Sequence, residues 1–157
     1  MFTIVVVFTC AACQYKTHAS GEALVSDMYP DELEAAMTSW SRVYGDTSAC
    51  DVSKLAVVVA DDEQFLLLCE RIGIVKTHKG EQRLAACTAQ VSDHTVIVIG
   101  EKFMSQETSV ILHELMHWLS ACTGNGNQFH HDNDVIWNAD DGILCNVCSE
   151  FDVECLN

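Results

Sequence analysis

Residues 113–117 read His-Glu-Leu-Met-His, a spacing that suits the binding of one metal ion. On a helix, side chains four positions apart lie on one face with their Cβ atoms about 5–6 Å apart. His113 and His117 would then bind the same zinc ion through imidazole nitrogens. Glu114 is rotated by one position, so it borders the metal without binding it. The pattern therefore predicts hydrolytic chemistry in which Glu114 accepts a proton from a zinc-activated water.

The residues around this motif are apolar on almost every side, so the helix that carries it is expected to be buried. Two histidines and a glutamate in a buried helix need strong polar partners, and a metal ion supplies one. The alternative is that the histidines hydrogen-bond to the backbone while Glu114 faces solvent. The apolar surroundings favour zinc; they are Val110, Ile111, Leu112, Leu115, Met116, Trp118 and Leu119.

The motif and the strands expected before it resemble the zincin metallopeptidases over roughly residues 50–137. The resemblance implies an α+β, zincin-like fold, with a small mixed or antiparallel sheet packed on helices and a buried active-site helix. It also implies that a peptide substrate pairs with the edge strand nearest the site, for which residues 95–99 are the candidate. The chain is not a standard metzincin, because Ser120 and Thr123 replace the glycine and histidine of that pattern.

A catalytic zinc ion normally has three protein ligands and one open position, so a third ligand is needed. The turn that contains Gly124 and Gly126 allows the chain to reverse and return towards the metal. The stretch HELMHWLSACTGNGNQFHHDNDVIW is similar to uncharacterised bacterial lipoproteins of the zincin type, which have a distal histidine shortly before a tryptophan. On that resemblance His131 is the predicted third ligand, with His130 second.

Other third ligands remain open at this point. Asp132 is a weaker alternative, and Glu150 or Glu154 would correspond to a glutamate supplied by a later helix, although the tail shows no convincing long helix. The histidine of the 130–131 pair that does not bind metal would orient a ligand, stabilise an oxyanion or lie in a surface loop.

These features predict a zinc metallopeptidase, with Zn²⁺ as cofactor, a peptide or protein as substrate, and Glu114 as general base. The predicted metal ligands are His113, His117 and His131. The alternative is a non-catalytic zinc-binding or interaction lipoprotein that keeps the zincin fold. Zinc bound entirely by protein groups, or a blocked edge strand, would favour that alternative.

The charge of the chain excludes several classes of partner. Its 157 residues include 8 Lys+Arg against 23 Asp+Glu, which gives a net charge of −15. Nucleic acids and anionic membrane surfaces are held by Lys and Arg, so neither is expected as a partner of the folded domain. No Lys or Arg follows Lys102, whereas four histidines and nine acids do. This half of the chain suits a bound cation; otherwise it is an acidic, solvated face.

The chain has nine cysteines, which favours an oxidising compartment. Cys145 and Cys148 have the CxxC spacing of a thiol-redox module or of half a zinc site. Because Cys122 and Cys155 lie near them in the sequence, ordinary disulfides that hold the tail are the favoured interpretation.

The N-terminus resembles a bacterial lipoprotein signal, since an apolar run over residues 2–12 ends in Ala-Ala-Cys13. Residues 1–13 are therefore a candidate signal with Cys13 as the lipid site, and the protein is expected to be extracytoplasmic, either secreted or membrane-anchored through lipid. The alternative is that residues 3–8 form a buried first strand. Residues 14–26 are predicted to be a tether, and residues 27–157 a single domain.

Hydrophobic periodicity and helix-stop residues predict the elements of this domain. The tail after residue 127 is expected to be mostly irregular. Helices are predicted over residues 30–44, 63–72 and 105–122, and strands over residues 55–60, 84–91 and 95–99, with the last two joined in a hairpin around residues 92–94.

Overall fold

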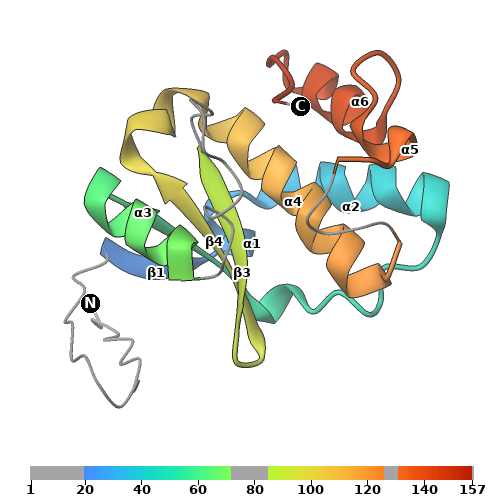
Figure 1. Cartoon of the computed structure of the whole chain (residues 1–157). Coiled ribbons are helices and arrows are strands. Elements are labelled where there is room, and N and C mark those ends of the chain that lie inside the picture. Colours follow the sequence, from blue (N-terminus) through green and yellow to red (C-terminus); the bar gives the residue numbers. More distant parts are fainter. Residues whose placement is uncertain (1–19, 72–84, 126–130, 157) are drawn as a thin grey trace.

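The structure is a computed structural model that describes residues 20–71, 85–125 and 131–156. Four strands form one mixed sheet: β1 (Ser20–Leu24), β2 (Leu55–Ala60), β3 (Ala86–Val91) and β4 (His94–Gly100). Their order across the sheet is β1-β2-β4-β3 (Figure 1). Strands β2 and β4 are parallel, while β1 and β3 run antiparallel to their neighbours. The α+β class predicted from the sequence is confirmed.

Strand β4 is an interior strand, which corrects the prediction that residues 95–99 form the sheet edge. It pairs with β2 on one side, where Leu55 lies opposite Thr95, and with β3 on the other, where Thr88 lies opposite Ile97. Within the described residues β3 is the outermost strand on this side. The hairpin places the strand that comes earlier in the sequence outside the later one, an order that sequence patterning does not reveal.

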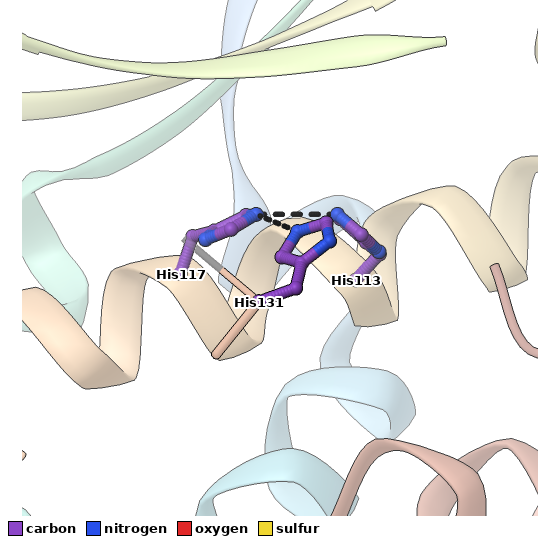
Figure 2. A group of neighbouring side chains, drawn as sticks. All are labelled: His113, His117 and His131. Atoms are coloured by element: carbon purple, nitrogen blue, oxygen red, sulfur yellow. Dashed lines mark hydrogen bonds between the residues drawn. The ribbon is translucent and has the colours of Figure 1, made fainter. Parts of the chain in front are cut away.

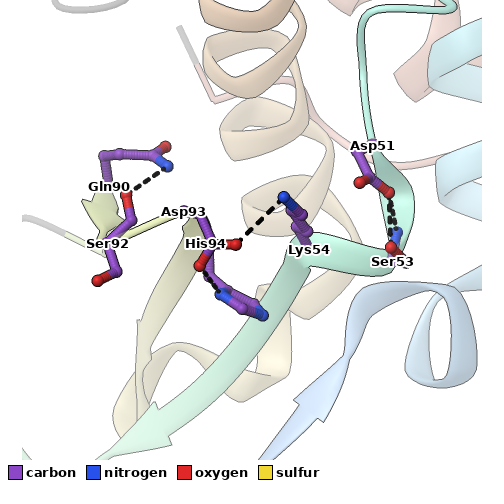
Figure 3. Close-up of polar contacts among 7 residues, drawn as sticks. All are labelled: Asp51, Ser53, Lys54, Gln90, Ser92, Asp93 and His94. Atoms are coloured by element: carbon purple, nitrogen blue, oxygen red, sulfur yellow. Dashed lines mark hydrogen bonds and ion pairs between the residues drawn. The ribbon is translucent and has the colours of Figure 1, made fainter.

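The hairpin between β3 and β4 turns at residues 92–93, as predicted (Figure 3). Ser92 adopts a positive φ of 59° in this turn. Asp93 binds both the Nζ of Lys54, at 3.2 Å, and the Nδ1 of His94, at 2.8 Å. These contacts connect the tip of the hairpin to the start of β2. His94 therefore contributes a side-chain contact within the turn.

Helices cover both faces of the sheet (Figure 1). Helix α3 (Asp62–Arg71) lies on one face, where Phe65 and Cys69 pack against Cys87 and Val98. The opposite face carries a larger core. This core contains residues of five helices, which are α1 (Val25–Met28), α2 (Pro30–Tyr44), α4 (Glu107–Thr123), α5 (Asp134–Trp137) and α6 (Ile143–Glu150). Two 3₁₀ turns lie at Val52–Lys54 and Glu101–Gln106.

Local sequence signals account for most of the positions at which the helices and strands begin and end. Helix α2 begins at Pro30, whose fixed φ suits the first turn, and ends before Gly45, which has a φ of 88°. Helix α4 ends before Gly124, which adopts the left-handed conformation at a φ of 69°. The bounds of α2 and β2 are those predicted, and α3 begins one residue before its prediction.

Two segments differ from the prediction. Ser20–Leu24, assigned to a tether, is a strand that pairs with β2, and Val25 is fully buried at the start of α1. The tail, expected to be irregular, contains α5 and α6. Helix α6 is only 8 residues long, and its buried face packs against α2 and α4, so tertiary packing stabilises a segment too short to be recognised by periodicity. The predicted signal and the rest of the tether lie outside the described residues.

Two disulfides link distant parts of the domain. Cys50 pairs with Cys122 across 72 residues, and Cys69 pairs with Cys87 across 18. Disulfides indicate an oxidising, extracytoplasmic environment, as the cysteine content predicted. The expectation that Cys122 would help to hold the tail is wrong, because its partner is in the loop after α2. The tail cysteines are free thiols: Cys145, Cys148 and Cys155.

In the part of the chain that the structure describes, no helix has the length and apolar character needed to cross a membrane.

Candidate metal centre

Helix α4 presents the HExxH motif from the middle of the core. Its neighbours are β3 and β4 of the sheet and helices α2 and α6. Val110, Ile111, Leu115 and Leu119 are at most 2% exposed, so packing holds the helix rigidly. The predicted burial of this helix is confirmed. His113 and His117 lie on one partly exposed face, as the four-residue spacing requires.

The three predicted metal ligands come together at this face (Figure 2). The Nε2 atom of His117 lies 3.2 Å from Nε2 of His113 and 3.1 Å from Nε2 of His131. One ligand nitrogen from each residue lies within 4.8 Å of the other two. The three histidines are therefore close enough to bind one metal ion.

The protonation of His113 supports this conclusion. Its Nδ1 lies 2.5 Å from the carbonyl oxygen of Leu156. A carbonyl only accepts hydrogen bonds, so Nδ1 is the donor, and Nε2 of the neutral ring is the acceptor nitrogen that faces His117. Burial lowers the pKa of His113, which favours that neutral form. A ligand histidine held through its other nitrogen by a backbone carbonyl is a common arrangement at metal sites, so the donor set fits a metal ion.

His131 reaches the cluster from the segment that precedes α5. The neighbouring Asn133 fixes this segment in two ways: its Oδ1 accepts from the backbone N–H of Val135 at 3.1 Å, and its Nδ2 donates to the hydroxyl of Tyr44 at 3.0 Å. The first contact caps α5 and the second ties the segment to α2. His131 is exposed, and these contacts of Asn133 help to hold its segment, in addition to the contacts of the His131 ring itself.

Trp137 lies beside all three histidines. Its ring centroid is 4.9 Å from that of His113, 4.7 Å from His117 and 4.2 Å from His131. The indole is 6% exposed, so it forms a packed wall of the cluster and restricts the rotamers of the rings. In the sequence, Trp137 is recognisable only by its position soon after His131, and that position was the available signal.

Glu114 lies inside the protein, 5% exposed, and receives a hydrogen bond from Thr88 Oγ1 to its Oε2 at 2.5 Å. Burial raises the pKa of Glu114 to about 7, and the hydrogen bond from Thr88 opposes that rise. Thr88 was not among the residues predicted for the site. Strand alternation was the available signal, because Thr88 shares a face of β3 with Ala86, which belongs to the core beneath α4.

The other predicted ligands do not join the cluster. Asp132, Glu150 and Glu154 are exposed, and the three histidines are the only group of potential ligands close enough for one metal within the described residues. His130 lies outside the described residues. Among the candidates that the structure describes, His131 is the one that lies beside His113 and His117.

Comparison of the chain with models of protein families, with curated proteins and with solved structures finds no match.

Proposed function

We propose that this chain is a zinc-dependent metallopeptidase of the zincin type. One observation carries the proposal: the ring nitrogens of His113, His117 and His131 lie close together, and the helix that carries His113 and His117 also carries the buried Glu114. Three imidazoles leave an open coordination position on a tetrahedral ion, which is the ligand arrangement of catalytic rather than structural zinc sites. Zinc is proposed over other imidazole-binding metals because the HExxH motif is typical of zinc hydrolases.

The roles of the residues follow from their environments. His113, His117 and His131 would hold the ion, which when bound polarises the scissile carbonyl and makes water more acidic. Glu114 would accept a proton from the attacking water and deliver it to the amine nitrogen as the C–N bond breaks. Its buried carboxylate, with a pKa raised to about 7, is suited to both transfers near neutral pH. Thr88 would hold this carboxylate in place.

Strand β3 is the proposed site for an extended peptide. It is the outermost strand on its side of the described sheet, and Thr88 in its middle contacts Glu114. A peptide that added to this strand by backbone hydrogen bonds would therefore pass beside the proposed general base. This assignment replaces the interior strand β4 as the substrate strand.

The protein would act outside the cytoplasm, in agreement with its two disulfides. Lipid attachment at Cys13 stays a prediction, because that residue lies outside the described part of the chain.

The test compares three purified proteins: the native chain, Glu114→Gln, and Glu150→Gln as a control at an exposed glutamate of α6. Each is loaded with zinc and assayed with a library of internally quenched peptides. We expect all three to hold one zinc ion, and Glu114→Gln alone to lose at least about 100-fold in rate, since a positioned acid–base group contributes 10²–10⁴-fold.

Equal peptidase rates in the native chain and in Glu114→Gln would contradict the mechanism. If all three proteins bind one zinc ion and none of them cleaves a peptide, the result would instead support the alternative of a non-catalytic zinc-binding or interaction lipoprotein. Absence of zinc binding by the native chain would contradict both proposals.

A further inference from the structure

Three free thiols gather at the C-terminal end of the chain, outside the histidine cluster. Cys145 and Cys148 lie on α6, one turn apart, and Cys155 follows in the last segment. Cys148 is fully buried, whereas Cys145 and Cys155 are partly exposed. The two disulfides indicate an oxidising environment, in which free thiols tend to be oxidised to disulfides. The oxidation state of these three thiols therefore bears on what the C-terminal segment does.

The last segment folds back over α6. The backbone N–H groups of Phe151 and Val153 both donate to the carbonyl of Cys148, at 3.1 and 3.2 Å, and Asp152 between them has a φ of 55°. This reversal returns Cys155 to the helix, where its Sγ donates to the carbonyl of Leu144 at 3.7 Å. In an α-helix that carbonyl is the acceptor for residue 148, so Cys155 lies at the turn that carries Cys148.

The two thiols also influence each other electrostatically. Burial and a hydrogen bond with the Cys155 thiol raise the pKa of Cys148 well above its usual range. Burial raises the pKa of Cys155 as well, but Cys155 is partly exposed whereas Cys148 is fully buried, so Cys155 is the thiol of this pair that an external reagent can reach.

We propose that Cys148 and Cys155 form a third disulfide, which anchors the C-terminal segment to α6. The Cys155 thiolate attacks an external disulfide, such as oxidised glutathione, and expels one thiolate. The Cys148 thiol then passes its proton to a thiolate and attacks Sγ of Cys155, which expels the second. Two protein thiols are oxidised, two external thiols are formed, and the new bond is Cys148 Sγ–Cys155 Sγ.

The alternative bond within the CxxC sequence is unfavourable on α6. Side chains three positions apart on a helix have Cβ atoms about 5–6 Å apart, whereas a disulfide needs about 3.5–4.5 Å. Linking Cys145 to Cys148 would therefore distort the helix, whereas Cys155 lies after the end of α6 and is not subject to this constraint.

This bond would act on the metal centre through the residue next to Cys155. The carbonyl of Leu156 accepts the Nδ1–H of His113 and so sets which nitrogen of that ring faces the cluster. The structure shows this contact while Cys155 is a free thiol, so the disulfide would not create the contact but would restrict the motion of Leu156 further. Leu156 is thus a positioning residue; this part of the inference rests on the proposed metal centre.

The first test maps the disulfide in the full-length chain after equilibration with oxidised glutathione. Cleavage after Glu150 separates the peptide that contains Cys148 from the one that contains Cys155. We expect the two peptides to remain joined in the native chain and in Cys145→Ser, and to separate in Cys148→Ala. Free Cys155 in the oxidised native chain, or loss of the link in Cys145→Ser, would overturn the proposed pair. This result does not depend on any activity or bound metal.

The second test measures cobalt(II) affinity by its visible absorption, again without a peptidase assay. We expect Cys155→Ser to bind about 10-fold more weakly than the oxidised native chain, which is at the lower end of the 10–100-fold cost of losing a group that supports a metal ligand. Cys145→Ser is the matched control and should bind like the native chain. Equal affinity of Cys155→Ser and the oxidised native chain, both folded by circular dichroism, would overturn the link between the disulfide and His113.

Discussion

At the scale of single residues, the candidate site depends on a small number of contacts to groups far away in the sequence. Glu114 is oriented by Thr88, His113 by Leu156, and the three ligand rings by Trp137. Ligands that are not held in place bind metal poorly. These supporting groups therefore determine whether two histidines and a glutamate on a helix form a metal site or only a group of polar side chains in the core.

Replacement of His131 by alanine should weaken zinc binding more than any replacement of a supporting group. It removes one of three ligand nitrogens, whereas loss of a supporting contact costs about 10–100-fold in affinity. Competition with a chromophoric chelator measures the effect, and Asp132→Asn is the control because this neighbour is exposed and lies outside the cluster. An unchanged affinity for His131→Ala would mean that His131 is not the third ligand.

Replacement of Thr88 by valine should lower peptidase activity without loss of zinc. The change removes the hydrogen bond to Glu114 and leaves a buried carboxylate oxygen without that donor, at a cost of about 1–3 kcal/mol in unfolding free energy. Thr88→Ser, which keeps the hydroxyl, should restore both activity and stability. Urea unfolding and the peptide assay measure the two effects, and full activity in Thr88→Val would argue against a role for this contact.

At the scale of the elements, the disulfides connect the parts that carry the site. The Cys50–Cys122 bond joins the loop after α2 to the last turns of α4, while the Cys69–Cys87 bond joins α3 to β3. One bond therefore holds the helix of the proposed ligands and the other holds the strand of Thr88.

Removal of the longer disulfide should destabilise the domain more than removal of the shorter one. The loops they close span 72 and 18 residues, and in the chain-entropy model the longer loop contributes about 1 kcal/mol more. Urea unfolding of the two double alanine variants, each with the other bond intact, gives the comparison. The reverse order would show that native-state packing around Cys69 and Cys87 outweighs loop entropy.

At the scale of the whole molecule, a metal ion would join segments that are separated in the chain. His113 and His117 belong to α4, and His131 precedes α5. An ion that binds the folded state and not the unfolded chain stabilises the fold by mass action. The acidic charge of the chain, −15, increases the attraction for a cation at low ionic strength.

Chelation should therefore lower the thermal stability of the native chain. Free zinc at 100 times its dissociation constant contributes about 2.7 kcal/mol to the unfolding free energy. Differential scanning calorimetry with zinc and with excess EDTA measures this contribution. The His113→Ala/His117→Ala variant is the control, and its Tm should not respond to either addition; an unresponsive native chain would argue against a metal that couples the segments.

Local patterns in the sequence were sufficient for part of this structure. The bounds of α2 and β2, the burial of α4 and the turn of the hairpin follow from apolar periodicity, proline and glycine, which act over a few residues. The short tail helices did not follow, because packing against other elements stabilises them. Ser20–Leu24 looked like a tether for the same reason: its partner strand begins at Leu55.

The sequence by itself determined the chemistry that this protein has available: two histidines and a glutamate at helical spacing, a third histidine after a glycine turn, and cysteines for an oxidising compartment. Only the tertiary structure decided which groups support that chemistry. Thr88 lies 26 residues from Glu114, Leu156 lies 43 from His113, and Cys50 lies 72 from Cys122. Contacts over such separations depend on how the elements pack around the core, and local sequence preferences carry no record of that packing.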